Sequence, residues 1–175
     1  ACTAKSTIAS RLSERLNLPN VLQTDLLMEL IRGTEGGPLA PEYLWERPLE
    51  ADTVVAEFKR ECRALRKGLE GDLEKCRRDS KAVILEGMHL DPSVYLNEAS
   101  VRTIMPDGAG GWQVACAAGD GPEESAAAPI IIPIVLTMAQ EDHGQLVEEW
   151  IQYRCPSLDG REMERVKRRL RAIDE

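Results

Sequence analysis

The chain has 175 residues, of which 43% are hydrophobic and 30% charged, so a single domain can bury a substantial core. Its formal net charge of −8 offers no basic surface for nucleic acid or anionic lipid. The longest mainly apolar run, residues 128–139, is shorter than a bilayer-spanning helix and contains two prolines. We therefore expect a protein that binds neither nucleic acid nor membranes.

The first half of the chain alternates helical and extended patterns. Apolar residues every fourth position predict a helix over 6–16, and a short strand over 20–23 and a helix over 26–31 follow. The glycines and prolines of 33–48 predict a loop. A long helix is expected next, because apolar residues then recur at steps of three or four: Phe58, Cys62, Leu65, Leu69, Leu73 and Cys76.

The second half continues the alternation. Residues 82–85 predict a buried strand, and 130–136 predict another that Pro133 shortens or places at an edge. Helical faces follow at 146–151 and 163–173. The whole pattern predicts one α/β domain over 1–175 with a mostly parallel sheet. Residues 106–128 are rich in Gly, Ala and acidic side chains, so we expect a flexible insertion there.

The 5 cysteines are an odd number, widely spaced, and none forms a C-x-x-C pair. This pattern disfavours a disulfide framework or a zinc site, and fits the cytoplasm or another reducing intracellular compartment. The first residues carry neither a starting Met nor a signal-type segment. They resemble the middle of a motif, so we expect the natural chain to begin earlier.

The opening of the chain suits phosphate binding. Lys5-Ser6 match the end of the P-loop, G-x-x-x-x-G-K-[ST], which lies between a strand and a helix. In such a loop backbone N–H groups and the helix N-terminus hold phosphates, the Lys reaches the outer phosphates and the hydroxyl binds Mg²⁺. The alternative is an ordinary helix N-cap. The first glycine and the strand before it would precede residue 1, so a chain of 1–175 alone is expected to be aggregation-prone and to bind ATP poorly.

Two carboxylates follow predicted strands. Asp25 ends the second strand of such a fold, and Glu86 ends the third. Ligands of open α/β sheets bind at the carboxyl ends of the strands, and a P-loop kinase needs carboxylates for the Mg²⁺ shell and for the acceptor hydroxyl. Asp25 could equally be a plain helix N-cap. Glu86 directly follows a buried apolar run and needs a partner there.

Five segments together resemble the 2-phosphoglycerate kinase family, and most closely its plant-type branch, the low-phytic-acid proteins. They are residues 5–10, 18–25, 58–69, 84–92 (ILEGMHLDP) and 142–150. The resemblance covers most of the chain except the insertion. It implies a P-loop NTPase three-layer sandwich, here without its first strand, and it implies ATP and Mg²⁺ as cofactors. The implied substrate is a small anionic phosphorylated metabolite, either 2-phosphoglycerate or a compound of inositol phosphate and phytate metabolism.

The resemblance and the residues together define a candidate kinase site. Lys5 would hold the outer phosphates, Ser6 would ligate Mg²⁺, and Asp25 would position or deprotonate the acceptor hydroxyl. Glu86 would orient the waters of the metal. The nucleotide-binding segment is completed by its remaining residues, Thr3, Ala4 and Thr7.

The sequence departs from the family pattern at two positions. Ala4 stands where the family has Gly before the Lys, and a Cβ there intrudes on the approach of the backbone to phosphate. Met28 stands where microbial members tend to carry an Arg, and Arg32, one turn later, is its candidate replacement for substrate binding.

The other basic side chains leave alternatives open. His89 could contact substrate phosphate or be a structural, hydrogen-bonded histidine, whereas His143 is interpreted as structural. The basic residues from 161 to 171 form either a solvated helix face or part of a lid. In the lid interpretation Arg154, Arg161 or Arg165 would neutralise phosphoryl charge.

Two functions follow from these residues. The first is an ATP- and Mg²⁺-dependent phosphotransferase that moves the γ-phosphoryl group to a hydroxyl of a small phosphorylated metabolite. The second is a degenerate P-loop module that binds a ligand or partner without catalysis, and Ala4 and the insertion favour it.

Overall fold

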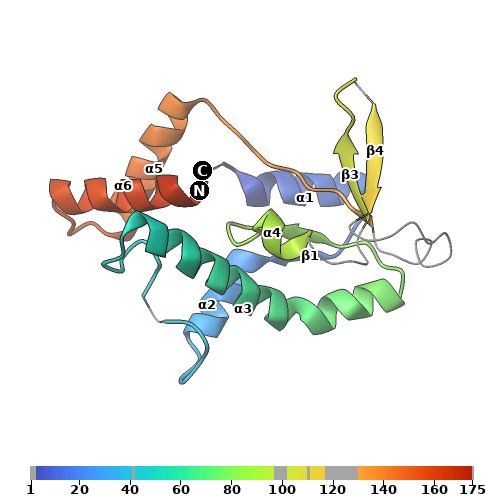
Figure 1. Ribbon diagram of the computed structural model, residues 1–175, viewed down its shortest axis with the longest axis horizontal. Helices are drawn as coiled ribbons and strands as arrows, with labels where there is room; N and C mark the ends of the chain where they lie inside the picture. The colour runs from blue at the N-terminus through green and yellow to red at the C-terminus, as the bar shows by residue number, and fades with distance from the viewer. Residues whose placement is uncertain (1–2, 41, 97–101, 110, 117–129, 175) are drawn as a thin grey trace.

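The computed structural model of the chain describes residues 3–40, 42–96, 102–109, 111–116 and 130–174. The helices are α1 (Lys5–Leu16), α2 (Thr24–Arg32), α3 (Ala51–Arg78), α4 (Pro92–Tyr95), α5 (Gln140–Arg154) and α6 (Gly160–Asp174). The strands are β1 (Val21–Gln23), β2 (Ile84–Glu86), β3 (Arg102–Pro106), β4 (Trp112–Cys116) and β5 (Ile130–Ile131). It is a mixed α/β structure in which helices pack around the parallel β1–β2 pair, while β3 and β4 project from one end of the molecule (Figure 1).

The first sheet consists of β1 and β2, which run parallel with Val21 opposite Ile84 and Gln23 opposite Glu86. The connection between them passes through α2 and α3, as a parallel pair requires. α1 packs against both strands. The predicted helix–strand alternation is therefore confirmed for this part of the chain, on the scale of a two-stranded parallel sheet.

In the second sheet only β5 falls within a strand predicted from the sequence, and β3 and β4 were not predicted. β3 pairs antiparallel with β4 and parallel with β5. β4, at Trp112–Cys116, falls inside the stretch that we expected to be a flexible insertion, and residues 117–128 of that stretch lie outside the described residues. β5 is shorter than the predicted 130–136 strand, because Pro133 has no N–H group to donate to a neighbouring strand.

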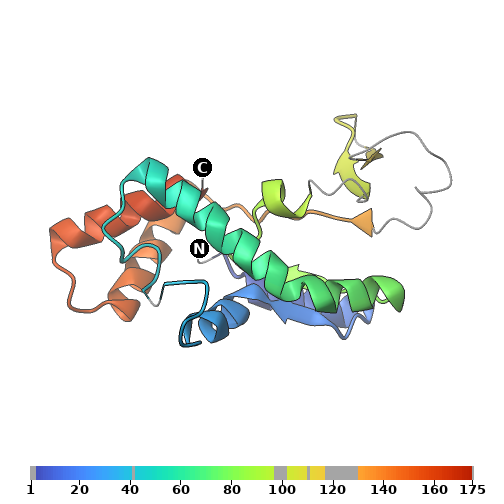
Figure 2. The ribbon, with the colours of Figure 1, turned by 60° about the horizontal axis from the view of Figure 1, so that its bottom comes forward.

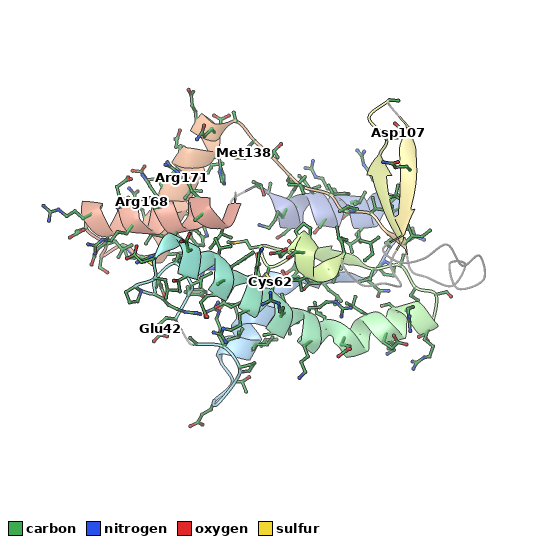
Figure 3. All side chains as sticks on the ribbon, in the orientation of Figure 1. Glu42, Cys62, Asp107, Met138, Arg168 and Arg171 are labelled. Atoms are coloured by element: carbon green, nitrogen blue, oxygen red, sulfur yellow. The ribbon has the colours of Figure 1, made fainter. Side chains whose placement is uncertain are left out.

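The long helix α3 organises the molecule. Figure 2 shows it running from the α5–α6 pair at one end to the layer of α1, β1 and β2 at the other. Its buried face carries side chains three or four residues apart, as predicted: Val54, Phe58, Cys62, Leu65 and Leu69. Burial raises the pKa of the Cys62 thiol to about 12, so this cysteine acts as a small apolar side chain. Figure 3 places it on the central part of α3.

The loop between α2 and α3 supplies one side chain to each of three buried clusters. Leu39 packs with Met28, Leu65 and Leu69. Leu44 packs with α3, and Trp45 packs with the α5–α6 pair. The described residues of this Gly- and Pro-rich loop lie in neither helix nor strand, as expected, yet their apolar side chains join the two ends of the molecule.

Two expectations from composition concern membrane-spanning helices and the state of the cysteines. None of the helices in the described ranges is both long and apolar enough to cross a bilayer. Among the cysteines whose side chains are described, Cys62, Cys76 and Cys155 are free thiols.

Leu65→Ala should destabilise the protein, because Leu65 is fully buried between α3 and α2. Removing a buried leucine side chain costs about 2–5 kcal/mol in the free energy of unfolding. Lys67→Ala is the control, since Lys67 is exposed on the same helix and its replacement should change that free energy by less than about 0.5 kcal/mol. Denaturant unfolding of both variants measures the difference, and equal effects would contradict the assignment of Leu65 to the core.

Candidate functional site

The carboxyl ends of β1 and β2 meet at one edge of the parallel sheet. Gln23 and Glu86, the last residues of the two strands, lie opposite each other. The backbone N–H of Met88, just after β2, donates a 2.9 Å hydrogen bond to Oδ1 of Asp25, just after β1. The structure therefore joins the two segments that carry the predicted carboxylates.

The position of Asp25 differs in detail from the prediction. β1 ends at Gln23, and Asp25 lies in the first turn of α2 instead of at the strand end. Its carboxylate accepts the bond from Met88 instead of capping its own helix. The helix N-terminus, with its partial positive charge, favours a carboxylate at this point.

Gly87 makes this close approach possible. Its φ of +145° lies in a region that other residues rarely adopt. A Cβ at this position would lie 1.9 Å from Oγ1 of Thr24 and 2.9 Å from Oδ1 of Asp25. The glycine after β2 thus allows the strand end to contact the start of α2.

A cavity of about 130 Å³ opens beside Asp25. Five residues that the sequence analysis selected line it: Lys5, Asp25, Arg32, His89 and Arg154. They come from α1, α2, the segment after β2, and α5, so only the tertiary fold brings them together. The other selected residues lie outside this lining.

The remaining residues of the predicted nucleotide segment flank Lys5 at the start of α1. Thr3 is half-buried, whereas Ala4, Ser6 and Thr7 are exposed. Ala4 adopts the left-handed conformation, with φ 53° and ψ 28°. This conformation costs a residue with a Cβ about 1–2 kcal/mol, a cost that glycine avoids. The departure from the family pattern thus coincides with a strained backbone position.

Asp25 is ionised at neutral pH. Burial alone would raise the pKa of its carboxyl group, but the His89 ring, the Met88 amide and the charge of Lys5 together hold that pKa below its usual value. The side chain is 49% exposed, toward the cavity. A half-exposed, ionised carboxylate is therefore available to a bound ligand.

Arg32 is held by the protein itself. Its guanidinium contacts Oε2 of Glu61 at 2.7 Å and donates to the carbonyl oxygens of Ala40 and Glu42 at 3.2 and 2.5 Å. The side chain is only 5% exposed. In this structure Arg32 connects α2 with the following loop and with α3, although we expected it to bind substrate.

Arg154 presents its charge to the cavity over aromatic rings. Its guanidinium carbon lies 5.6 Å from the centre of the Tyr43 ring and 5.8 Å from that of Trp150. It also donates a 3.3 Å hydrogen bond to the Tyr43 hydroxyl. Trp45 stacks on Tyr43 with ring centres 4.7 Å apart. Together with Trp150 these rings form an aromatic wall of the cavity, and their packing keeps it rigid. Arg161 and Arg165, the other predicted lid residues, are exposed on α6 and do not line the cavity.

Sequence reasoning missed this aromatic wall. Tyr43 and Trp45 lie in a loop without periodicity, and Trp150 lies in a helix where it looked like an ordinary apolar position. One signal was available: the chain has only 3 tryptophans, and two of them line the cavity. Rare aromatic side chains next to a Gly- and Pro-rich loop were a usable clue.

The residues present fit a magnesium ion. Glu86 is buried at 6% exposure, and its Oε2 has no hydrogen-bond partner among the described residues. Within the described ranges no three His, Cys, Asp or Glu side chains gather into a preformed metal cage. Mg²⁺ does not need one, because it keeps several waters and binds one or two carboxylates together with substrate phosphates.

The geometry defines a small pocket at the carboxyl edge of a parallel sheet, lined by basic side chains together with the carboxylates of Asp25 and Glu29. The comparisons with known proteins found partial similarity to three proteins named 2-phosphoglycerate kinase. The chain is 32% identical over 112 residues to 2-phosphoglycerate kinase of Methanocaldococcus jannaschii, covering 57% of this chain and 36% of that protein. The enzyme of the same name from Thermococcus kodakarensis is 30% identical over 97 residues, covering 50% and 33%.

A third 2-phosphoglycerate kinase, from Methanopyrus kandleri, is 31% identical over 103 residues, covering 53% of this chain and 31% of that protein. The chain thus spans about a third of the length of these relatives. No family model matches the chain, and no solved structure matches it significantly. The similarity is therefore a distant, partial homology to archaeal 2-phosphoglycerate kinases.

Gly87→Ala should damage the site, because the new Cβ would overlap Thr24 Oγ1 and crowd Asp25. Overpacking of this kind costs about 1–3 kcal/mol in stability, and the left-handed φ adds to that cost. Gly71→Ala is the matched control, since Gly71 lies inside α3 with nothing within 4 Å of the added Cβ. That variant should gain about 1 kcal/mol from helix propensity. Thermal unfolding separates the two, and a Gly87→Ala protein as stable as the native one would contradict the geometry.

Proposed function

We propose that this chain carries the phosphate- and acceptor-binding parts of a small-molecule kinase, which transfers the γ-phosphoryl group of ATP to a hydroxyl of a small phosphorylated metabolite. The observation that carries the proposal is the meeting of Lys5, Asp25 and Arg154 around one cavity. The similarity to proteins named 2-phosphoglycerate kinase supports it.

The start of α1 suits the nucleotide. Lys5 would neutralise the outer phosphates, and the backbone and hydroxyl groups of Thr3 to Thr7 would surround them at the helix N-terminus. ATP, when bound, supplies the phosphoryl group, and Mg²⁺ neutralises part of its charge. Ser6 and Glu86 are the residues that would hold the metal and its waters.

Asp25 would position the acceptor hydroxyl. Because its pKa is lowered, the carboxylate is a weak base and a stable hydrogen-bond acceptor. Phosphoryl transfer passes through a loose transition state in which orientation of the hydroxyl matters more than its early deprotonation. Of the two roles that the sequence left open for Asp25, the lowered pKa supports positioning.

Arg154 would bind the phosphate that the acceptor already carries. Its guanidinium is planar, lies over Tyr43 and Trp150, and lines the same cavity as Asp25. An arginine held in this way is preorganised for bidentate contact with phosphate. Arg161 and Arg165 would reach this place only if α6 moved, so we assign the role to Arg154.

The acceptor is either 2-phosphoglycerate or an inositol phosphate. The archaeal relatives support the first, and the resemblance to the plant-type branch supports the second. Both carry a free hydroxyl beside an anionic phosphate, so one assay can compare them. The small cavity favours the smaller acceptor.

A coupled assay of ADP release, with each acceptor in the presence of MgATP, tests the proposal. Lys5→Ala should lower kcat/KM by roughly 100-fold, because one cation that stabilises the transferred phosphoryl group is lost. Arg154→Ala should mainly raise the KM for the acceptor, by roughly 10-fold or more.

Arg168→Ala is the control for the loss of a positive charge, since Arg168 is exposed on α6 (Figure 3) and does not line the cavity. Its kinetic constants should match those of the native protein. Absence of Mg²⁺-dependent turnover with both acceptors, or turnover that survives Lys5→Ala unchanged, would contradict the kinase proposal.

The conformation of Ala4 favours a second candidate function, a P-loop module that binds a ligand or partner without catalysis. Its left-handed backbone places a Cβ next to the lysine that would hold phosphate. A site of this kind would bind MgATP weakly.

Ala4→Gly distinguishes the two candidates. It should stabilise the fold by about 1 kcal/mol, because glycine adopts the left-handed conformation without strain. Calorimetric titration of the full-length protein with MgATP shows which function applies. Tight binding by the native protein supports the kinase, and binding only in Ala4→Gly supports the degenerate module. Asn17→Gly is the matched control, since Asn17 has φ 53° at the other end of α1. It should leave ATP affinity unchanged.

A further inference from the structure

The His89 ring lies between two carboxylates from different elements. Its Nε2 is 3.4 Å from Oε2 of Glu61 on α3, and its Nδ1 is 3.9 Å from Oδ1 of Asp25 on α2. The residue is 7% exposed, and its ring packs against Phe58 with centres 5.4 Å apart. The imidazole is therefore fixed in place between the two acids.

Glu61 lies behind the ring and does not line the cavity. Its side chain is fully buried, and Arg32 and Arg47 bind its two carboxylate oxygens. A buried ion cluster seldom stabilises a fold more than apolar side chains of the same volume would. The contact of Glu61 with His89 points to a role in the site.

The ring can donate a proton toward both carboxylates only as the imidazolium, in which both nitrogens are protonated. A neutral imidazole has one N–H and one lone pair, so a bond from Nε2 to Glu61 would turn the lone pair of Nδ1 toward Asp25. Two carboxylates at the two nitrogens suit the imidazolium, which donates from both. Nδ1 has no hydrogen-bond partner among the described residues, and the 3.9 Å to Oδ1 of Asp25 is longer than a hydrogen bond, so the two groups attract each other by charge across that gap.

We infer that Glu61 is a positioning residue: it holds His89 as an imidazolium whose Nδ1–H faces Asp25, and His89 in turn fixes the orientation of the Asp25 carboxylate toward the acceptor hydroxyl. This inference rests on the proposed function for the role of Asp25. The contact of the three side chains does not depend on it.

The electrostatics agree with this arrangement. Burial alone would lower the pKa of His89, but Asp25 and Glu61 raise it above the usual value. The pKa of Glu61 is lowered, because His89, Arg32 and Arg47 outweigh its burial. The charged groups beside the ring are Asp25 and Glu61. Arg32 and Arg47 bind Glu61, and the charge of Lys5 acts on Asp25.

The arrangement predicts a dependence on pH. Below the raised pKa of His89 the imidazolium is present and Asp25 is held. As the pH rises through that pKa the proton leaves, Nδ1 presents a lone pair to the carboxylate, and both orientation and stability decrease. Activity should therefore have an alkaline limb that follows His89.

Histidine NMR titration of the full chain tests the inference, because the chain has only 2 histidines and a His143→Gln variant assigns the second. In the native chain the pKa of His89 should lie above about 6.5, and in Glu61→Gln it should fall by roughly 1 unit. Glu57→Gln is the matched control, since Glu57 contacts Arg47 at 3.5 Å from the same helix but does not contact the ring. It should leave the pKa of His89 unchanged.

The kinetic arm uses the same variants. In Glu61→Gln the alkaline limb of kcat should move to lower pH together with the pKa of His89, whereas the KM for ATP stays constant. Should the native chain show no turnover, the kinase proposal fails and the titration still decides this inference.

If Glu61→Gln does not fold, Asp25→Asn replaces it, because Asp25 is half-exposed and its loss leaves the buried cluster intact. A fall in the pKa of His89 in that variant supports the arrangement. A native pKa at or below about 6.5, or a pKa that neither variant moves, overturns it.

Discussion

The arrangement of the side chains around the cavity depends on the contacts of one buried carboxylate, that of Glu61. It binds Arg32 from α2, Arg47 from the loop and His89 from the segment after β2, while its own backbone belongs to α3. Four segments that are distant in the sequence therefore share one negative charge. A lone buried carboxylate would be costly, and its three basic neighbours both remove that cost and acquire fixed positions from it.

The loop between α2 and α3 contributes to the buried core, although its Gly- and Pro-rich composition does not suggest this. Glycine and proline exclude regular elements, but Leu39, Leu44 and Trp45 each enter a different buried cluster. Through Trp45 the loop joins α5 and α6 to the rest of the fold, and through the stacked Tyr43 it forms the wall on which Arg154 lies. The arginine from the C-terminal half therefore reaches the cavity because a loop in the N-terminal half holds it there.

Two backbone positions of the candidate site have opposite effects. Gly87 allows the end of β2 to approach α2, so that the Met88 amide can hold Asp25. Ala4, by contrast, introduces strain beside Lys5 at the place where phosphate would bind. In the proposed function the strained Ala4 lies on the side that would bind the nucleotide, and Asp25 lies on the side that would bind the acceptor. The two candidate functions therefore differ at one residue, Ala4.

The sequence alone was sufficient where a local pattern carries the information. The stripe from Phe58 to Leu69 predicted α3, and the apolar runs before Asp25 and Glu86 predicted two strands with carboxylates at one edge, because periodicity and burial are properties of neighbouring residues. It could not show that Arg32 is bound to Glu61 or that Tyr43, Trp45 and Trp150 form one wall. Arg32 and Glu61 are 29 positions apart, and the hydrogen bond from Arg154 to Tyr43 in this wall joins residues 111 positions apart. Only tertiary packing decides which side chains share a buried charge. Both Arg32 and Arg154 line the cavity, but packing binds Arg32 to a buried carboxylate and places Arg154 over aromatic rings.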